Sequence, residues 1–130
     1  MFALDTNTLI YFFKGIGRVG EHLRNTPPRE VSVPSVVLYE LEVGVAFSPQ
    51  RENRRRALDA LLQVIRVLPF DEAAARAAAS VRRTLEQAGS PIGPLDTLIA
   101  GTAIAHSALL VTHNAREFGR VRGLKIVDWF

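Results

Sequence analysis

The sequence contains no cysteine, and this absence removes several kinds of chemistry at once. Disulfide bonds, cysteine-bound zinc, iron–sulfur clusters and thiol nucleophiles are all excluded. A chain without cysteine suits a reducing cytoplasm, which is the compartment we expect. The three histidines, His22, His106 and His113, lack the HExxH-like spacing of zinc hydrolases, so that class of zinc enzyme is not predicted.

Long hydrophobic runs are also missing. The longest apolar region, Leu95–Val111, is interrupted by Asp96 and His106, and it predicts a buried helix followed by a strand rather than a membrane span. The first residues, MFALDTNTLIYFFKG, have no basic segment and place Asp5 before the apolar stretch. We therefore expect neither a signal peptide nor a membrane partner.

Lysine is scarce, whereas arginine is abundant: 14 of the 16 basic residues are arginine, and the net charge is +3. Guanidinium groups bind phosphate well, so this composition favours an anionic partner such as nucleic acid. The charge is unevenly distributed, because residues 46–90 contain 8 basic and 5 acidic groups, whereas residues 91–114 contain one acid and no basic residue.

The pattern that is present is that of one α/β domain spanning residues 1–130. Short apolar strands alternate with helices, which predicts a central, mainly parallel sheet with helices on both faces. Strands are expected at 2–4, 31–33, within 64–70, 109–112 and 124–127. Helices are expected at 6–14, 20–25, 35–47, 51–62, 72–88, 95–107 and 115–120.

Polar residues follow two of the predicted strands, at the positions where ligands bind in parallel sheets. Asp5 and Thr6 come after the first strand, and Thr112 and Asn114 come after the strand that begins at Leu109. The carboxyl ends of parallel strands meet at one edge of a sheet, so these side chains are candidates for a shared site.

Two further acids, Glu40 and Asp96, occur in apolar helical segments. Grouped carboxylates in such surroundings are costly unless a cation neutralises them. Oxygen donors without cysteine or histidine partners indicate Mg²⁺ or Mn²⁺. Spacing alone does not choose between Glu40 and Glu42, which point to different faces of one helix.

Each of these residues also has a purely structural interpretation. Asp5 suits the cap of the helix that follows it, and Asp96 lies near a helix start, where an acid favours the helix dipole. Asn114 and Glu117 have the spacing of a capping arrangement. His113 is expected to be a water-exposed loop residue near the site.

Five segments, in order along nearly the whole chain, carry a resemblance to a known family. They are Ala3-Leu4-Asp5-Thr6-Asn7, Ser35–Leu41 with Gly44, Pro94–Ala100, Leu110–Asn114 with Phe118, and Leu124–Trp129. No single segment is specific, but together they are similar to the PIN-domain ribonucleases of the VapC toxin type, from toxin–antitoxin pairs.

The resemblance implies a three-layer α/β/α PIN-like domain whose acids bind Mg²⁺ or Mn²⁺ and cleave RNA. By motif position the metal-binding acids are Asp5, Glu40 and Asp96. Glu40 is preferred to Glu42 because the family's acid precedes the motif glycine, here Gly44, by four residues.

Many relatives have a fourth acid where this chain has Asn114. An amide oxygen can bind a metal or orient a water but adds no charge, so occupancy of a second metal site stays open. By analogy with the same motifs, Thr6 and Thr112 supply supporting hydroxyl groups.

The resemblance also implies partners. RNA is the expected substrate, a small antitoxin is the expected protein partner, and a homodimer is expected, for which the helices at 35–47 and 51–62 offer apolar surface. The same apolar faces equally suit the core of a monomer. The candidate phosphate contacts are Arg116, Arg51, Arg54, Arg55 and Arg56. For the arginine run at 51–56, the alternative interpretation is a solvated helix face.

Two other functions stay open from the residues alone. An aspartate-based phosphatase of the haloacid-dehalogenase-like type also places an aspartate after an early strand, but it normally has a second aspartate two residues on, where this chain has Asn7. A non-catalytic RNA- or protein-binding module would keep the fold without turnover. The expected activity is metal-assisted hydrolysis of RNA phosphodiester bonds, with Asn114 orienting a water.

Overall fold

A computed structural model describes all 130 residues and contains five strands and seven α-helices. The strands are β1 (Phe2–Leu4), β2 (Val31–Pro34), β3 (Arg66–Leu68), β4 (Leu109–Val111) and β5 (Ile126–Val127). The helices are α1 (Thr6–Lys14), α2 (Val19–Arg24), α3 (Ser35–Ala46), α4 (Arg51–Leu62), α5 (Glu72–Gln87), α6 (Pro94–Ala105) and α7 (Ala115–Phe118), with a 3₁₀ turn at Pro28–Glu30.

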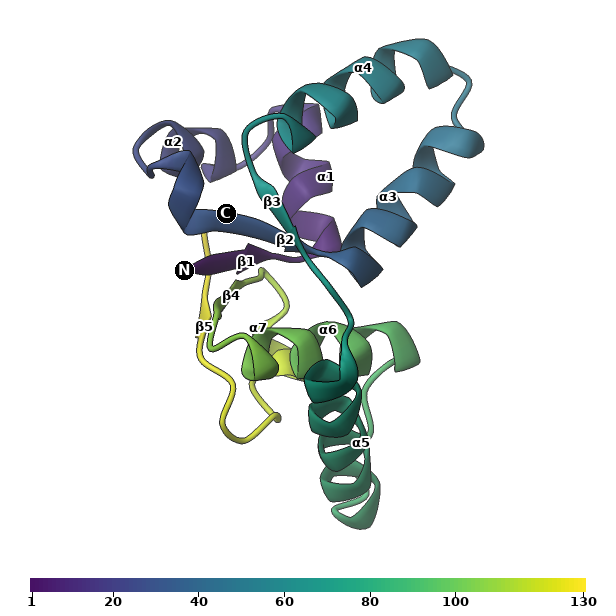
Figure 1. The fold of residues 1–130 in the computed structure, drawn as a ribbon, viewed down its shortest axis with the longest axis vertical. Coiled ribbons are helices and arrows are strands. Elements are labelled where there is room, and N and C mark those ends of the chain that lie inside the picture. The colour runs from purple at the N-terminus through teal and green to yellow at the C-terminus, as the bar shows by residue number, and fades with distance from the viewer.

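The strands form one sheet in the order β3-β2-β1-β4-β5, and every pairing is parallel. The chain moves outward from β1 to β3 and then returns to the other side of β1 to add β4 and β5. Crossovers between parallel strands are right-handed. The helices that connect β1 to β3 therefore lie on one face of the sheet, and the helices that lead to β4 and β5 lie on the opposite face. Figure 1 shows α1–α4 on one side of the sheet and α5–α7 on the other. The expected three-layer α/β/α fold is confirmed, with a fully parallel sheet.

The direction of the connections reverses between β1 and β4. These strands pair directly, with Leu4 opposite Val111. In open parallel sheets, the crevice outside the carboxyl ends of the strands at such a reversal is where ligands bind. Asp5 leaves β1 and Thr112 leaves β4 at this crevice, so the topology brings together residues that are far apart in the sequence.

Local signals in the sequence fix the ends of two helices. Helix α1 covers the predicted residues 6–14, because Asp5 caps its start and Gly15 ends it with a left-handed φ of 68°. Asp71 caps α5 in the same way, by accepting a hydrogen bond from the Ala74 amide at 2.9 Å. The cap at Asp5 is the structural interpretation that its sequence position had allowed.

The last strand is shorter than predicted. Strand β5 covers only Ile126–Val127, whereas residues 124–127 were expected. The Leu124 amide donates to the Val121 carbonyl at 3.3 Å, so it is used in a turn and not in the sheet.

The last helix is also shorter, and it ends at Phe118 instead of Arg120. The amides of Arg120 and Val121 bond to carbonyls three residues earlier, which tightens the chain into turns. A smaller correction concerns Pro34, which belongs to β2 rather than ending the strand before it, because proline is tolerated as the final residue of a strand. The remaining boundaries lie within a few residues of those expected.

Helices α5 and α6 pack unusually closely at Gly101, in the interior of α6. A Cβ atom at Gly101 would lie 2.6 Å from the backbone nitrogen and Cα of Ala78 in α5. Only a residue without a side chain fits there, because the obstacle is backbone that cannot rotate away.

Helix α6 is apolar but has only 12 residues, and no helix in the structure is long and apolar enough to cross a membrane.

Candidate active site

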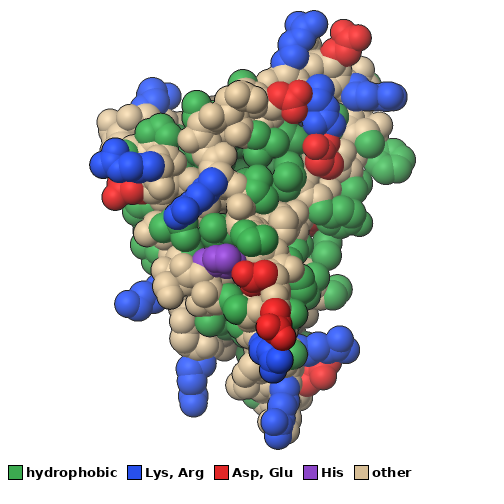
Figure 2. Space-filling view, in the orientation of Figure 1, with side chains coloured by type: hydrophobic (Ala, Val, Ile, Leu, Met, Phe, Trp, Pro, Cys, Tyr) green, Lys and Arg blue, Asp and Glu red, His purple; other side chains and the backbone are tan.

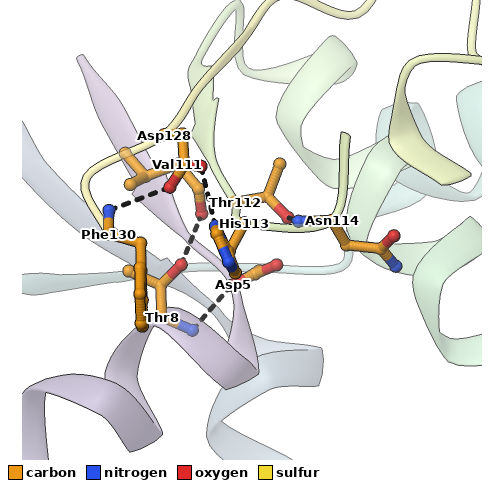
Figure 3. A network of polar contacts seen from close by, with 8 residues as sticks. All are labelled: Asp5, Thr8, Val111, Thr112, His113, Asn114, Asp128 and Phe130. Atoms are coloured by element: carbon orange, nitrogen blue, oxygen red, sulfur yellow. Dashed lines mark hydrogen bonds and ion pairs between the residues drawn. The ribbon is translucent and has the colours of Figure 1, made fainter. Parts of the chain in front are cut away.

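Asp5 lies at the end of β1, in the crevice between β1 and β4. Its backbone amide donates to the Val111 carbonyl at 3.1 Å, and its buried carboxylate accepts a hydrogen bond from the Thr8 amide at 2.9 Å. Burial raises the pKa of Asp5 above its ordinary value, although hydrogen bonds from Thr112 and Thr8 oppose that shift. Figure 3 shows Asp5 beside the polar residues that follow β4. A buried carboxylate of this kind favours a nearby cation.

Glu40 reaches the same region from the middle of α3. The Thr6 hydroxyl donates to Glu40 Oε1 at 2.6 Å, which joins the first turn of α1 to α3. Glu42, two residues later, instead forms an ion pair with Arg55 of α4. The structure therefore brings Glu40, and not Glu42, to the candidate site.

Asp96 lies in the first turn of α6, and its pKa is strongly shifted. Burial is the main cause that raises the pKa of Asp96 to about 6, followed by a hydrogen bond and charge repulsion from Glu117 and by the charges of Glu40 and Asp5. Two carboxyl groups share a hydrogen bond only when one is protonated, so Asp96 and Glu117 repel each other when both are ionised. Three acids from other parts of the chain thus act on Asp96 in one place.

Glu117 is the site residue that the sequence reasoning missed, because that reasoning used it only as a helix cap. The cap is present: the Glu117 amide donates to Asn114 Oδ1 at 3.3 Å. Asn114 Nδ2 also donates to Glu117 Oε2 at 3.4 Å, so the asparagine orients the carboxylate as well. The signal that could have found it is the Asn-x-x-Glu spacing, which places a carboxylate one turn after the neutral Asn114.

Two hydroxyl groups support these acids. Thr6 holds Glu40, as described above, and the buried Thr112 accepts a hydrogen bond from the Asn114 amide at 2.9 Å. Thr112 therefore fixes the loop from which Asn114 and Glu117 project. The predicted role of Asn114 in orienting a water stays a prediction.

The four acids form an all-oxygen donor set, which is the set that Mg²⁺ and Mn²⁺ prefer. No three His, Cys, Asp or Glu side chains form a ready-made metal cage in the structure. Mg²⁺ retains several water molecules and commonly binds proteins through one or two carboxylates. The donor set therefore fits a hydrated cation, held partly through water.

A groove of about 490 Å³ opens beside Glu40, between α1, α3 and α4. Apolar side chains such as Ile10, Leu41 and Val45 line it, together with Lys14. Figure 2 shows hydrophobic side chains in this area and Lys and Arg side chains mainly around the edge of the same face. An apolar surface therefore lies next to Glu40, one of the acids of the candidate site.

The five candidate arginines have different surroundings. Arg54 lines the groove that contains Glu40, whereas Arg55 is bound by Glu42 and Asp59. The other three are exposed, two on α4 and one on α7 beside Glu117: Arg51, Arg56 and Arg116. Contact between any of them and phosphate stays a prediction.

The raised pKa of Asp96 predicts a pH dependence of stability for the metal-free protein. The folded state holds this proton more tightly than the unfolded state, so the contribution is fully present below about pH 4 and is lost as the pH rises through about 6. After allowance for solvent screening, the loss amounts to about 1–2 kcal/mol. Urea denaturation from pH 4.5 to 7.5 would measure it, because Asp96→Asn removes this part of the pH dependence. Parallel curves for wild type and variant would contradict the prediction.

Comparisons with known proteins agree with this fold. The PIN domain family model matches residues 2–124. The chain is 36% identical over 128 residues to the tRNA(fMet)-specific endonuclease VapC of Shigella flexneri, covering 98% of this chain and 97% of the relative. It is 32% identical over 137 residues to ribonuclease VapC2 of Rickettsia felis, covering 99% of this chain and 98% of the relative.

Solved structures give the same result. The DNA-bound VapBC of Salmonella typhimurium matches with a TM-score of 0.93 and 34% identity, covering 99% of this chain and 98% of that one. The DNA-bound VapBC2 of Rickettsia felis matches with a TM-score of 0.92 and 33% identity, again covering 99% of this chain and 98% of that one. With its matching fold, its converging acids and these full-length relatives, the chain belongs to the PIN-domain family, as a member of the VapC ribonuclease toxin type.

Proposed function

We propose that this protein is a Mg²⁺- or Mn²⁺-dependent endoribonuclease and the toxin of a toxin–antitoxin pair. The observation that carries the proposal is the convergence of Asp5, Glu40, Asp96 and Glu117 at the reversal point of the sheet, where burial first and the neighbouring acids second raise the pKa of Asp96 to about 6. Such a cluster is unfavourable without a cation and suits an enzyme that acts on a phosphodiester. Because RNA is the proposed substrate, the cytoplasm remains the expected compartment.

In this proposal each residue has a distinct task. Asp5 and Asp96 hold the cation, and Glu40 binds it directly or through water, while Thr6 orients Glu40 through their hydrogen bond. A bound divalent cation lowers the pKa of a water molecule and polarises a phosphate. Glu117 adds the fourth negative charge, and its carboxylate is oriented by Asn114, whose own predicted contact is with a water.

The substrate proposal rests on the relatives and on the charge. The Shigella relative is named for tRNA(fMet), so this tRNA is the first RNA to test. Exposed Arg116 lies on α7 next to Glu117, and Arg54 lies in the groove with Glu40, so phosphates on either side of the acids would meet a guanidinium group. Arg51 and Arg56 extend the positive surface along α4.

The groove beside Glu40 is our proposed antitoxin site, since solved relatives are VapBC complexes. A partner segment with apolar side chains would fill it, and a cationic side chain at its end would neutralise Glu40. Such a segment would block the acids that hold the cation.

A separate face of α3 is available for the proposed homodimer. Tyr39, Val43 and Phe47 recur every four residues and are exposed, Phe47 by 85%. Tyr39 and Val43 on the helix and Phe47 directly after its end form a single apolar stripe, which is the pattern of a helix face that packs against a partner.

Removal of metal tests the activity. Purified protein, freed of any co-purified small protein, is expected to cleave the tRNA with Mg²⁺ or Mn²⁺ and to lose at least about 100-fold in rate when EDTA removes the cation. Gel analysis of end-labelled RNA measures the cuts, and added Mg²⁺ or Mn²⁺ is expected to restore them. Cleavage that persists in EDTA would contradict the proposal.

The same preparation separates the alternatives. RNA binding that depends on salt but never leads to cleavage would favour a non-catalytic module. A stable phosphorylated Asp5 after treatment with an acyl phosphate would favour the aspartate-based phosphatase.

A further inference from the structure

Aromatic side chains from three elements meet at the same end of the sheet as the acids. His113 follows β4 between Thr112 and Asn114, Tyr11 comes from α1, and Phe130 follows β5. The rings of His113 and Phe130 are stacked, with centroids 4.3 Å apart and planes 22° from parallel. The proposed mechanism uses none of these three side chains.

One face of the His113 ring is left without an aromatic neighbour. Tyr11 lies 4.9 Å from Phe130 and 5.9 Å from His113, nearly perpendicular to both. With the two stacked rings 4.3 Å apart, these distances place Tyr11 beside the stack and not on top of it. The His113 side chain is 45% exposed, so part of it lies at the surface although Phe130 stacks on one face.

The stack is held in place by several polar contacts. Asp128 Oδ2 lies 2.7 Å from His113 Nδ1, and Asp128 Oδ1 accepts a hydrogen bond from the Phe130 amide at 2.8 Å. The Arg18 amide donates to the Phe130 carbonyl at 2.7 Å, and Gly17 leaves no room for a Cβ against the Phe130 ring. The rings are therefore oriented before any ligand arrives, and the contact with Asp128 uses His113 Nδ1 and not Nε2.

The stack also adjoins the acids. Thr112 forms a hydrogen bond with Asp5, and the charge of Asp128 acts on Asp5. Figure 3 shows His113, Asp128 and Phe130 close to Asp5, Thr8 and Thr112. A ligand on His113 would thus be a neighbour of whatever the acids bind.

We propose that the free face of His113, backed by Phe130, is a stacking site for an unpaired base of the RNA substrate next to the scissile phosphate. Proteins bind single-stranded RNA by stacking bases on aromatic rings, including histidine. The stack fits this ligand because it is a preformed ring surface beside a phosphodiester-cleaving site, with one ring nitrogen free to bond a base edge. The proposal rests on the proposed ribonuclease function.

The test is a comparison of His113→Ala and His113→Phe on a short RNA that contains the cut site. Loss of one base–aromatic stack lowers affinity by about 5- to 150-fold, so His113→Ala is expected to raise KM within that range and to change kcat little. His113→Phe is expected to restore most of the loss, because phenylalanine also stacks. Thermal denaturation confirms that both variants fold.

Two further measurements localise the effect. In the slowly cleaving Asp96→Asn background, His113→Ala is expected to weaken the binding of fluorescent RNA by a similar factor, as measured by anisotropy. An abasic nucleotide at the stacked position is expected to weaken wild-type binding and to abolish the difference in affinity between wild type and the His113→Ala variant. Abasic nucleotides elsewhere in the RNA are expected to preserve that difference.

A matched control is His106→Ala. His106 ends α6, whereas Asp96 lies in its first turn, about 15 Å away along the axis. This substitution is expected to leave KM unchanged.

The outcomes separate the two proposals. If wild type shows no metal-dependent cleavage, the ribonuclease function fails. If wild type cleaves and His113→Ala matches it in KM and binding, the ribonuclease function stands and the stacking site is wrong. His113→Phe as weak as His113→Ala would also overturn the stacking site.

Discussion

Asp96→Asn is expected to reduce the rate of RNA cleavage by about 100- to 1,000-fold while the protein stays folded. The substitution keeps the shape of the side chain but removes a charge that is proposed to hold the cation, and about 3–4 kcal/mol of transition-state stabilisation is expected to be lost with it. The same change relieves the repulsion among Asp96, Glu117, Glu40 and Asp5, so the metal-free variant is expected to be more stable than wild type at pH 7. Single-turnover cleavage and urea denaturation measure the two effects.

A substitution that lowers activity but raises stability distinguishes a metal-binding acid from a structural one. Glu42→Gln is the matched control, because this carboxylate is also on α3 but pairs with Arg55 away from the site. Its removal is expected to leave cleavage unchanged and to cost at most about 1 kcal/mol of stability, as for other exposed ion pairs. Asp96→Asn with wild-type activity would remove Asp96 from the proposed site.

Gly101→Val is expected to lower the free energy of unfolding by about 3 kcal/mol or more. The new Cβ would lie 2.6 Å from the Ala78 backbone, so α5 and α6 must separate and lose packing along their whole contact. For a domain of this size the melting temperature is expected to fall by roughly 10 °C. Circular dichroism during heating measures the change.

Gly44→Ala provides the control for this prediction. Gly44 is also inside a helix, α3, but a Cβ there meets nothing within 4 Å. Alanine is expected to stabilise α3 by about 0.5–1 kcal/mol, because glycine loses more backbone freedom on folding. Equal effects at the two glycines would show that helix propensity, and not the close approach of α5 and α6, determines the cost at Gly101.

The parts of the fold that the sequence predicts well are those set by local signals. Asp5 and Gly15 fix both ends of α1, and Asp71 fixes the start of α5, because each acts through the nearest backbone groups. The ends of β5 and α7 were predicted less well. They depend on turns near Val121, where competing hydrogen bonds a few residues apart decide the outcome.

The candidate site shows the same division. Asp5, Glu40 and Asp96 were identified in advance, and the choice of Glu40 over Glu42 needed the family resemblance until the structure placed Thr6 and Arg55 against them. Glu117 was missed because capping already explained it. The stack of His113 on Phe130 was also missed, because it depends on long-range packing between β4 and β5 that no local pattern records.

The order of the strands has a consequence for the synthesis of the protein. Asp5 and Glu40 leave the ribosome early, but Asp96 and Glu117 come from the last third of the chain, and β4 must dock beside β1 before the four acids can meet. During most of translation, the nascent chain therefore contains only two of the four acids of the candidate site. In the proposed mechanism, cleavage must therefore await synthesis of nearly the whole polypeptide.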